Sequence, residues 1–257
     1  TSTTWNPVTE VYGAAGPIAG TLVTALLSLV MAVPVALGVA VFLTEFCPRV
    51  LRRPIGVAVE LLAGIPSIVY GMWGLFVFAP MFSRFVQLPL MSAAKPGSLL
   101  ETLTSGVPNG SGILSASIIL AIMILPFMAA TLRELLLTVP PAVRESAYGL
   151  GATTAEVVMS VTLPYVRTGA IGAVMLGLGR ALGETMAVTF IIGNSHGFPK
   201  SLFDSGSTIA STIANEFTEA STPMHTAALI ALGLVLFVIT FIVLGFARLM
   251  LRTQVVR

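Results

Sequence analysis

The chain has 257 residues, of which 56% are hydrophobic and only 9% are charged. Soluble globular proteins carry about 25% charged residues, so this composition excludes an ordinary soluble domain and indicates a polytopic membrane protein. The formal net charge of +2 gives no reason to expect a nucleic-acid partner, and the single cysteine, Cys47, excludes an intrachain disulfide.

Five apolar stretches are long enough to cross a bilayer as helices, for which about 20 residues suffice. Pro66, which lies between two glycines in the second stretch, predicts a break in that helix. Residues 83–111 and 194–224 are expected to be polar loops. The chain begins at Thr1 rather than at Met, so we expect the native chain to start earlier. The five predicted spans are residues 14–43, 55–82, 112–132, 169–193 and 226–246.

Lysine and arginine are divided unequally between the two sides of these spans. By the positive-inside rule, the richer side is cytoplasmic: residues 44–54, residues 133–165 and the C-terminus. The N-terminus and the two polar loops then face outward. The cytoplasmic set is Arg49, Arg52, Arg53, Arg133, Arg144, Arg167, Arg248, Arg252 and Arg257, and the outward set is Arg84, Lys95 and Lys200.

Two charged residues, Arg180 and Glu184, lie in the fourth apolar stretch. A charge at the centre of a membrane helix costs about 2.5–3.5 kcal/mol on insertion scales, so both must face protein or water. Their i,i+4 spacing predicts a shared helix face, about 6 Å apart. Two interpretations remain open: Arg180 binds a tetrahedral oxyanion and Glu184 neutralises it in the empty path, or the pair only fixes helix packing.

The remaining polar candidates carry weaker predictions. Ser67 and Tyr70, at the broken helix, either line the same path or pack in the core, and Glu60 is expected to pair with an arginine. His196 and His225 are isolated and lack the spacing of metal ligands, so no metal site is predicted. Because the chain has no G-x4-G-K-[ST] motif, we expect no nucleotide site in it.

The charged segment 133–165 has the pattern of a helix-turn-helix on the cytoplasmic side. Residues 142–149 can form a short helix after Pro140-Pro141, and Gly149 and Gly151 flank a turn. A second helix over 154–161, capped by Thr153 or Thr154, is expected to end before Pro164. An ordinary connecting loop is the alternative interpretation.

The same segment resembles the EAA signature of ABC-importer permeases, EAA-x3-G-x9-I-x-L-P. Ser146 and Val161 replace the Ala and Ile of that pattern. The resemblance implies an all-α, type I importer permease fold in a single domain, residues 1–257, with 138–164 docking into a separate ATPase subunit. The permease function implies no cofactor and no enzymatic activity in this chain. The matching residues are Glu145, Ser146, Ala147, Gly151, Val161, Leu163 and Pro164.

Residues 60–80, 108–127 and 177–194 resemble the PstC-type permeases of phosphate importers. That resemblance implies import of inorganic phosphate across the bacterial cytoplasmic membrane. The implied partners are a second homologous permease in a heterodimer, an ATPase dimer, an external phosphate-binding protein and membrane lipid. It also implies a sixth, N-terminal helix, and it associates Arg180 and Glu184 with phosphate passage; Thr185 is assigned to the same path.

Three other functions remain as alternatives. A permease of this class for sulfate or molybdate would carry the same signature. A proton-coupled secondary anion transporter would use Glu184 as a relay and need no ATPase, and the signature in 133–165 argues against it. A structural or sensory membrane protein would carry no flux.

Overall fold

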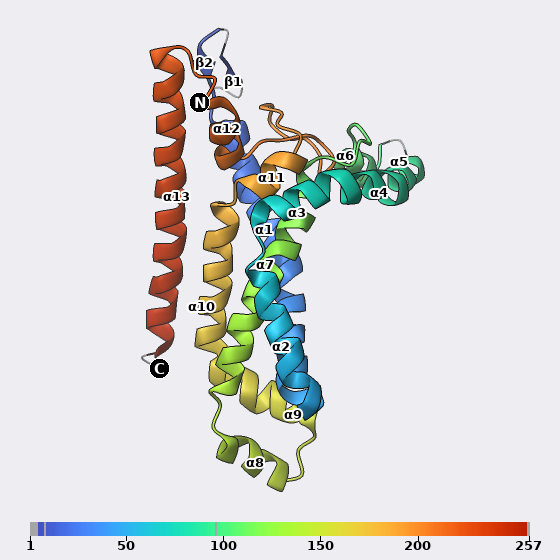
Figure 1. Ribbon diagram of the computed structural model, residues 1–257, viewed down its shortest axis with the longest axis vertical. Helices are drawn as coiled ribbons and strands as arrows, with labels where there is room; N and C mark the ends of the chain where they lie inside the picture. The colour runs from blue at the N-terminus through green and yellow to red at the C-terminus, as the bar shows by residue number, and fades with distance from the viewer. Residues whose placement is uncertain (1–4, 8, 96, 256–257) are drawn as a thin grey trace. The chain divides into compact units, whose positions relative to one another are not determined.

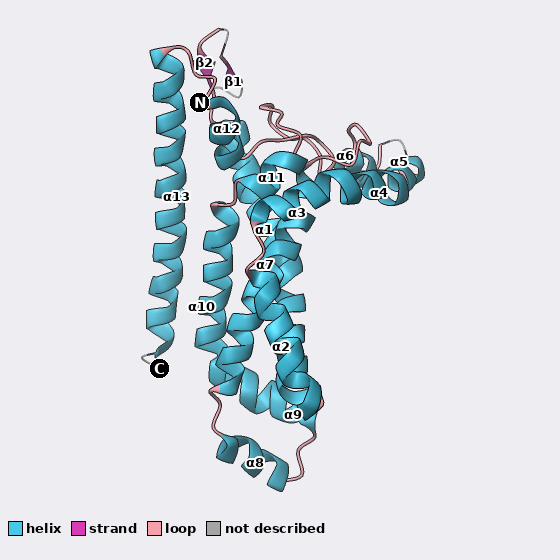
Figure 2. Ribbon diagram, viewed as in Figure 1, coloured by secondary structure: helices cyan, strands magenta, loops and turns pink. Residues whose placement is uncertain are grey.

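The computed structural model describes residues 5–7, 9–95 and 97–255, and most of them are helical (Figure 2). The described strands are β1 (Trp5–Asn6) and β2 (Val11–Tyr12), which form an antiparallel hairpin with Trp5 opposite Tyr12. Five helical stretches are long and apolar enough to cross a membrane: Ala15–Phe46, Ser67–Ala93, Ile113–Leu137, Thr154–Leu182 and Pro223–Leu249. The all-α class and the number of spans are therefore confirmed, whereas the bounds of the second and fourth spans were predicted wrongly.

The second predicted span is two helices, and the predicted break is confirmed. Helix α2 (Arg49–Ala63) ends before the Gly64–Pro66 turn, and α3 (Ser67–Trp73) begins directly after it. The helix then continues, without the predicted polar loop, through η2 (Gly74–Phe78), α4 (Ala79–Phe82), η3 (Ser83–Gln87) and α5 (Leu88–Ala93); α6 (Leu99–Thr104) follows.

Buried side chains explain why the first part of the predicted loop, up to Ala93, is helical. Phe82 is buried, and the carboxamide oxygen of buried Gln87 accepts the backbone N–H of Gly110 at 2.8 Å. The hydroxyl of Ser83 donates to the carbonyl of Pro108. The polar residues that suggested a loop therefore bind the chain that follows, while the backbone stays helical.

The fourth predicted span is also displaced. Helices α9 (Thr154–Val157), η4 (Val158–Thr162) and α10 (Leu163–Leu182) form one continuous span, so the expectation that a helix ends before Pro164 was wrong. The wider π-helical turn of η4 ends at Thr162, two residues before Pro164. It accommodates a proline, which lacks an N–H and clashes with the preceding turn. A separate helix, α11 (Met186–Ile191), follows a break at 183–185.

The other helices complete the chain in order. Helix α1 (Ala15–Val41) continues into η1 (Phe42–Phe46), and α7 (Ile113–Leu137) precedes the short α8 (Pro141–Gly149). Helix α12 (Ile209–Glu216) lies within the second predicted loop, where a capping box between Thr208 and Ser211 begins it. Helix α13 (Pro223–Val255) ends the described chain (Figure 1).

Two compact units divide the chain. The first contains the described residues up to Ser28, Pro66–Ala121 and Arg180–Phe241, and the second contains Leu29–Ile65, Ile122–Gly179 and the described residues from Ile242 onward. Within the first unit, Trp5, Ile209, Leu229 and Leu232 form a buried apolar cluster. Within the second unit, Leu132, Leu136, Val157 and Val166 are among the buried apolar side chains.

Candidate substrate path and coupling segment

The helix break at 183–185 changes the predicted relation between Arg180 and Glu184. Arg180 lies two residues before the end of α10, whereas Glu184 lies beyond that end. The prediction of one continuous helix carrying both residues was therefore wrong. Glu184 instead lies just before α11, where its carboxylate accepts the backbone N–H of Ala187 at 3.3 Å. Glycine at 183 and a carboxylate near the N-terminus of the following helix are the sequence features that favour this break.

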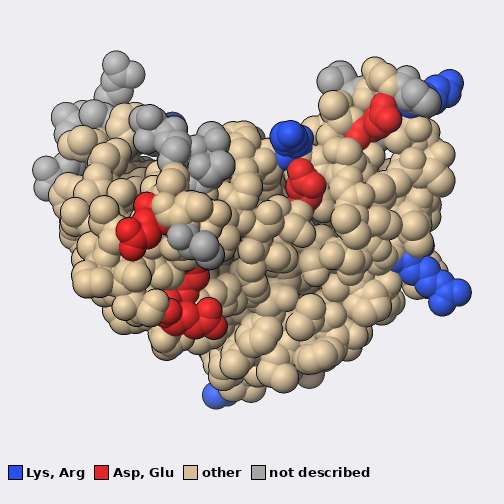
Figure 3. Space-filling view, turned by 90° about the horizontal axis from the view of Figure 1, so that it is seen from above, with Lys and Arg blue, Asp and Glu red and all other residues tan. Residues whose placement is uncertain are grey.

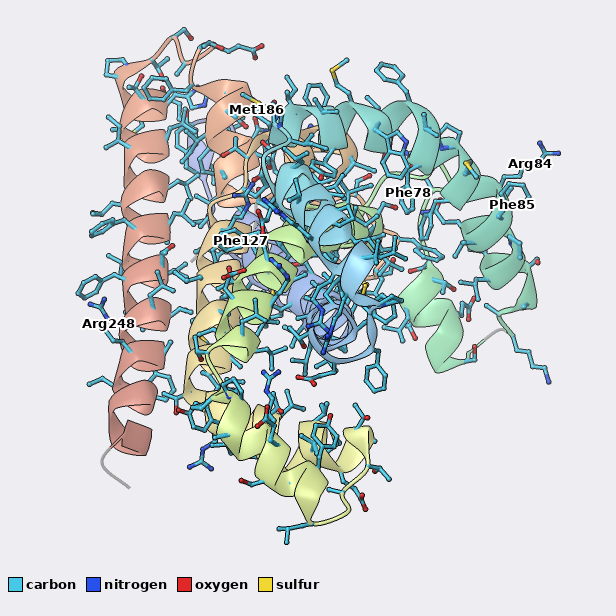
Figure 4. All side chains as sticks on the ribbon, turned by 60° about the horizontal axis from the view of Figure 1, so that its bottom comes forward. Phe78, Arg84, Phe85, Phe127, Met186 and Arg248 are labelled. Atoms are coloured by element: carbon cyan, nitrogen blue, oxygen red, sulfur yellow. The ribbon has the colours of Figure 1, made fainter. Side chains whose placement is uncertain are left out.

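Close packing of α3 against α11 brings together, within the first unit, the two helices that follow the breaks. A Cβ atom at Gly71 would lie 3.0 Å from the Cα of Ala187, the carbonyl oxygen of Met186 and a ring carbon of Phe190. Only a residue without a side chain permits this approach. Met186, labelled in Figure 4, is the first residue of α11 and is exposed.

The polar side chains predicted for the path belong to these packed elements. Tyr70, on α3, lies within electrostatic range of the Arg180 guanidinium. Ser67 is one helical turn before Tyr70, so the two share a helix face. Thr185 precedes α11, and its carbonyl oxygen accepts the hydroxyl of Thr189 at 2.7 Å. All five candidates, Arg180, Glu184, Thr185, Ser67 and Tyr70, are partly exposed.

The second unit holds the segment that resembles the EAA signature, and its predicted first helix is confirmed as α8. The segment lies at one extremity of this unit (Figure 1). Gly151 has a φ of +88°, the left-handed conformation that glycine adopts without strain, and it forms the predicted turn after α8. Thr153 caps the next helix through a capping box with Glu156.

The signature residues are accessible. Glu145, Ser146, Gly151 and Pro164 are exposed, whereas Ala147, Val161 and Leu163 are partly exposed. Leu150, between the signature residues, is 91% exposed. An apolar side chain so exposed in a charged segment is available to a protein partner.

Charged residues next to this segment form ion pairs inside the second unit. Glu60 pairs with Arg133 at 3.0 Å, which confirms the prediction that it pairs with an arginine. Arg133 also pairs with Glu134 at 3.0 Å. Its guanidinium lies over Gly56, so a Cβ atom added at Gly56 would be 3.0 Å from Cζ of Arg133. This contact holds α2 against α7.

In the first unit, the two histidines that looked isolated share one carboxylate. Glu216 lies 2.9 Å from Nε2 of His196 and 2.8 Å from Nε2 of His225, and it accepts the indole N–H of Trp5 at 2.9 Å. The prediction that the histidines are isolated was wrong, because the contact joins distant parts of the sequence. Within the described residues no His, Cys, Asp and Glu group of metal-binding kind occurs.

Charged side chains elsewhere are scattered. The face seen in Figure 3 is mostly uncharged, with a few separate acidic and basic residues. Arg84 lies 5.9 Å from the ring centroid of Phe85, and both project from η3 (Figure 4). Arg248 projects from α13 in the same figure, whereas Arg257 lies outside the described residues.

Comparison with known proteins places these features in a family. The model of the binding-protein-dependent transport system inner membrane component matches residues 32–254. The chain belongs to this family. Its relatives include the phosphate transport system permease protein PstC of Mesorhizobium japonicum, 57% identical over 98% of this chain and 77% of that protein. The PstC of Pasteurella multocida is 55% identical over 96% of this chain and 77% of that protein.

Solved structures agree with the family at the level of the fold. The inward-facing MetNI methionine ABC transporter matches with a TM-score of 0.62 at 17% identity, covering 94% of each chain. A bacterial ABC transporter involved in import of the acidic polysaccharide alginate matches with a TM-score of 0.62 at 20% identity, covering 92% of this chain and 78% of that one. The chain therefore has the fold of an ABC-importer permease, and it is a transport subunit rather than an enzyme.

Proposed function

We propose that this chain is the permease subunit of an ATP-driven importer of inorganic phosphate in the bacterial cytoplasmic membrane. It acts as a single permease domain with a cytoplasmic C-terminus. The likeness to PstC proteins over nearly the whole chain supports this function, since it extends far beyond the signature that importers for other substrates share.

The observation that carries the proposal is the grouping of Arg180 and Tyr70 beside the break at 183–185. A guanidinium offers a planar set of donors that matches the oxygens of a tetrahedral anion. The hydroxyls of Tyr70, Ser67 and Thr185 supply further donors. Glu184 lies within the break, beyond the end of α10, and keeps the net charge of the empty path low, so that phosphate binding stays reversible.

The second half of the proposal concerns coupling. Residues 138–164 dock on an ATPase dimer through the exposed side chains around Leu150, with Glu145, Ser146, Ala147, Gly151, Val161, Leu163 and Pro164 shaping the segment. A second homologous permease completes a heterodimer in the lipid bilayer, and an external binding protein delivers phosphate. ATP-driven movement of the segment switches the path between its two open states.

Uptake of labelled phosphate into liposomes that contain the complete transporter tests this function. We expect uptake that requires both internal ATP and the binding protein, and that excess unlabelled sulfate does not reduce. Uptake that sulfate or molybdate blocks would assign another oxyanion. Uptake that persists without ATP and collapses when the proton gradient is dissipated would assign a secondary transporter.

A further inference from the structure

We propose that a buried ion pair between Arg144 and Glu45 transmits the movement of α8 to the membrane helices. Nη1 of Arg144 lies 2.9 Å from Oε1 of Glu45, and the two side chains are only 17% and 7% exposed. The proposal rests on the coupling role assigned above to residues 138–164. It adds a specific contact through which that role is performed.

Arg144 connects three elements of the second unit. Its own backbone lies in α8, directly before Glu145. Its guanidinium contacts Glu45 in η1, at the end of the first span, and donates to the carbonyl of Leu136 near the end of α7. Since the planar guanidinium holds both partners in fixed directions, a displacement of α8 acts on the ends of α1 and α7 together.

The contrast with its neighbours distinguishes Arg144 from a docking residue. Glu145 and Ser146 are exposed, whereas the Arg144 side chain points into the unit. The chain itself connects α8 to α7 on one side and to α9, η4 and α10 on the other. The ion pair therefore supplies a further route, to η1 at the end of the first span, which lies far from α8 in the sequence.

The location of Glu45 supports this role. It lies in the π-helical turn η1, which ends the first span and precedes α2. In this turn Thr44 donates its hydroxyl to the carbonyls of Ala40 and Val41. Such turns interrupt the regular hydrogen bonding of a helix and are frequent at functional sites. A buried carboxylate in this turn is costly unless paired, so its position depends on Arg144.

A cycle of neutral substitutions tests the proposal in the reconstituted transporter with its partner permease, ATPase and binding protein. The variants are Glu45→Gln, Arg144→Gln and the double variant, and the readout is phosphate taken up per ATP hydrolysed. Because the double variant leaves no unpaired charge in the interior, we expect it to assemble and to hydrolyse ATP. The amount of phosphate that the double variant takes up per ATP hydrolysed should fall by roughly fivefold or more. A factor of about five is the low end of measured coupling between distant sites.

A matched control and the contrary results complete the test of the ion pair. Glu134→Gln, which changes an exposed ion pair in the same region, serves as the matched control and should keep the wild-type ratio. A double variant with the wild-type ratio, or one that does not assemble at all, would show that the pair serves folding alone. If the wild-type transporter itself shows no ATP-dependent phosphate uptake, the proposed function fails instead.

Discussion

The crossing of α3 and α11 depends on the absence of a side chain at Gly71, and Gly71→Ala measures that dependence. The added Cβ would lie 3.0 Å from the Cα of Ala187 and from the carbonyl oxygen of Met186. Backbone atoms cannot turn aside as a side chain would, so α3 and α11 must separate by a few tenths of an ångström. Overpacking of this kind costs about 1–3 kcal/mol.

Gly172→Ala is the matched control, because nothing lies within 4 Å of the Cβ it adds to α10. Both substitutions gain about 1 kcal/mol of helix propensity, so the difference in unfolding free energy between the variants isolates the overpacking, about 1–3 kcal/mol. We expect Gly71→Ala to raise the KM for phosphate uptake by about threefold to tenfold. A misplacement of 1 Å at a site costs roughly a hundredfold, and a shift of a few tenths of an ångström should cost correspondingly less.

Thermal unfolding of the purified complex in detergent and uptake kinetics in liposomes provide the two measurements. Equal stability of the two variants, with an unchanged KM for phosphate, would refute the claim that the α3–α11 contact positions the path. A loss of stability without a change in KM would confine Gly71 to packing.

Two further perturbations address other parts of the molecule. Glu216→Ala leaves the buried indole N–H of Trp5 without an acceptor, so the free energy of unfolding should fall by about 1–3 kcal/mol and the fluorescence of Trp5 should shift. Glu219→Ala, at an exposed position, should change neither the stability nor the fluorescence. Gly151→Ala places a side chain at a φ of +88°, which costs about 1–2 kcal/mol, and should lower the amount of phosphate taken up per ATP hydrolysed. Gly149→Ala, at an ordinary φ, should retain the wild-type amount. Equal phosphate uptake per ATP in the two variants would count against the docking role of the segment.

Hydropathy predicted the number of spans because a membrane-crossing helix needs a long apolar stretch whatever its neighbours are. Local capping chemistry likewise predicted α8, the turn at Gly151 and the cap at Thr153. The break at Pro66 followed from proline and glycine alone. These features depend on residues adjacent in sequence, which is why they were visible in it.

The errors arose where distant residues or wider helical turns decide the structure. Pro164 does not end a helix because η4 accommodates it, and hydropathy gave no sign of that turn. The sharing of Glu216 by His196, His225 and Trp5 joins segments far apart in the sequence. The pairing of Arg144 with Glu45 has the same character. In the candidate path, the sequence suggested one helix for Arg180 and Glu184 and did not predict the break at 183–185.

The direct test of the central claim is phosphate uptake by Arg180→Gln in the complete reconstituted transporter. Arg167→Gln, which removes an exposed arginine from the same helix, is the matched control, and the amount of assembled complex is measured for both. Loss of a charged contact to phosphate, worth about 2–5 kcal/mol, predicts a fall in uptake of roughly thirtyfold or more for Arg180→Gln and uptake close to wild type for Arg167→Gln. A well-assembled Arg180→Gln transporter that imports phosphate at the wild-type rate would contradict the account.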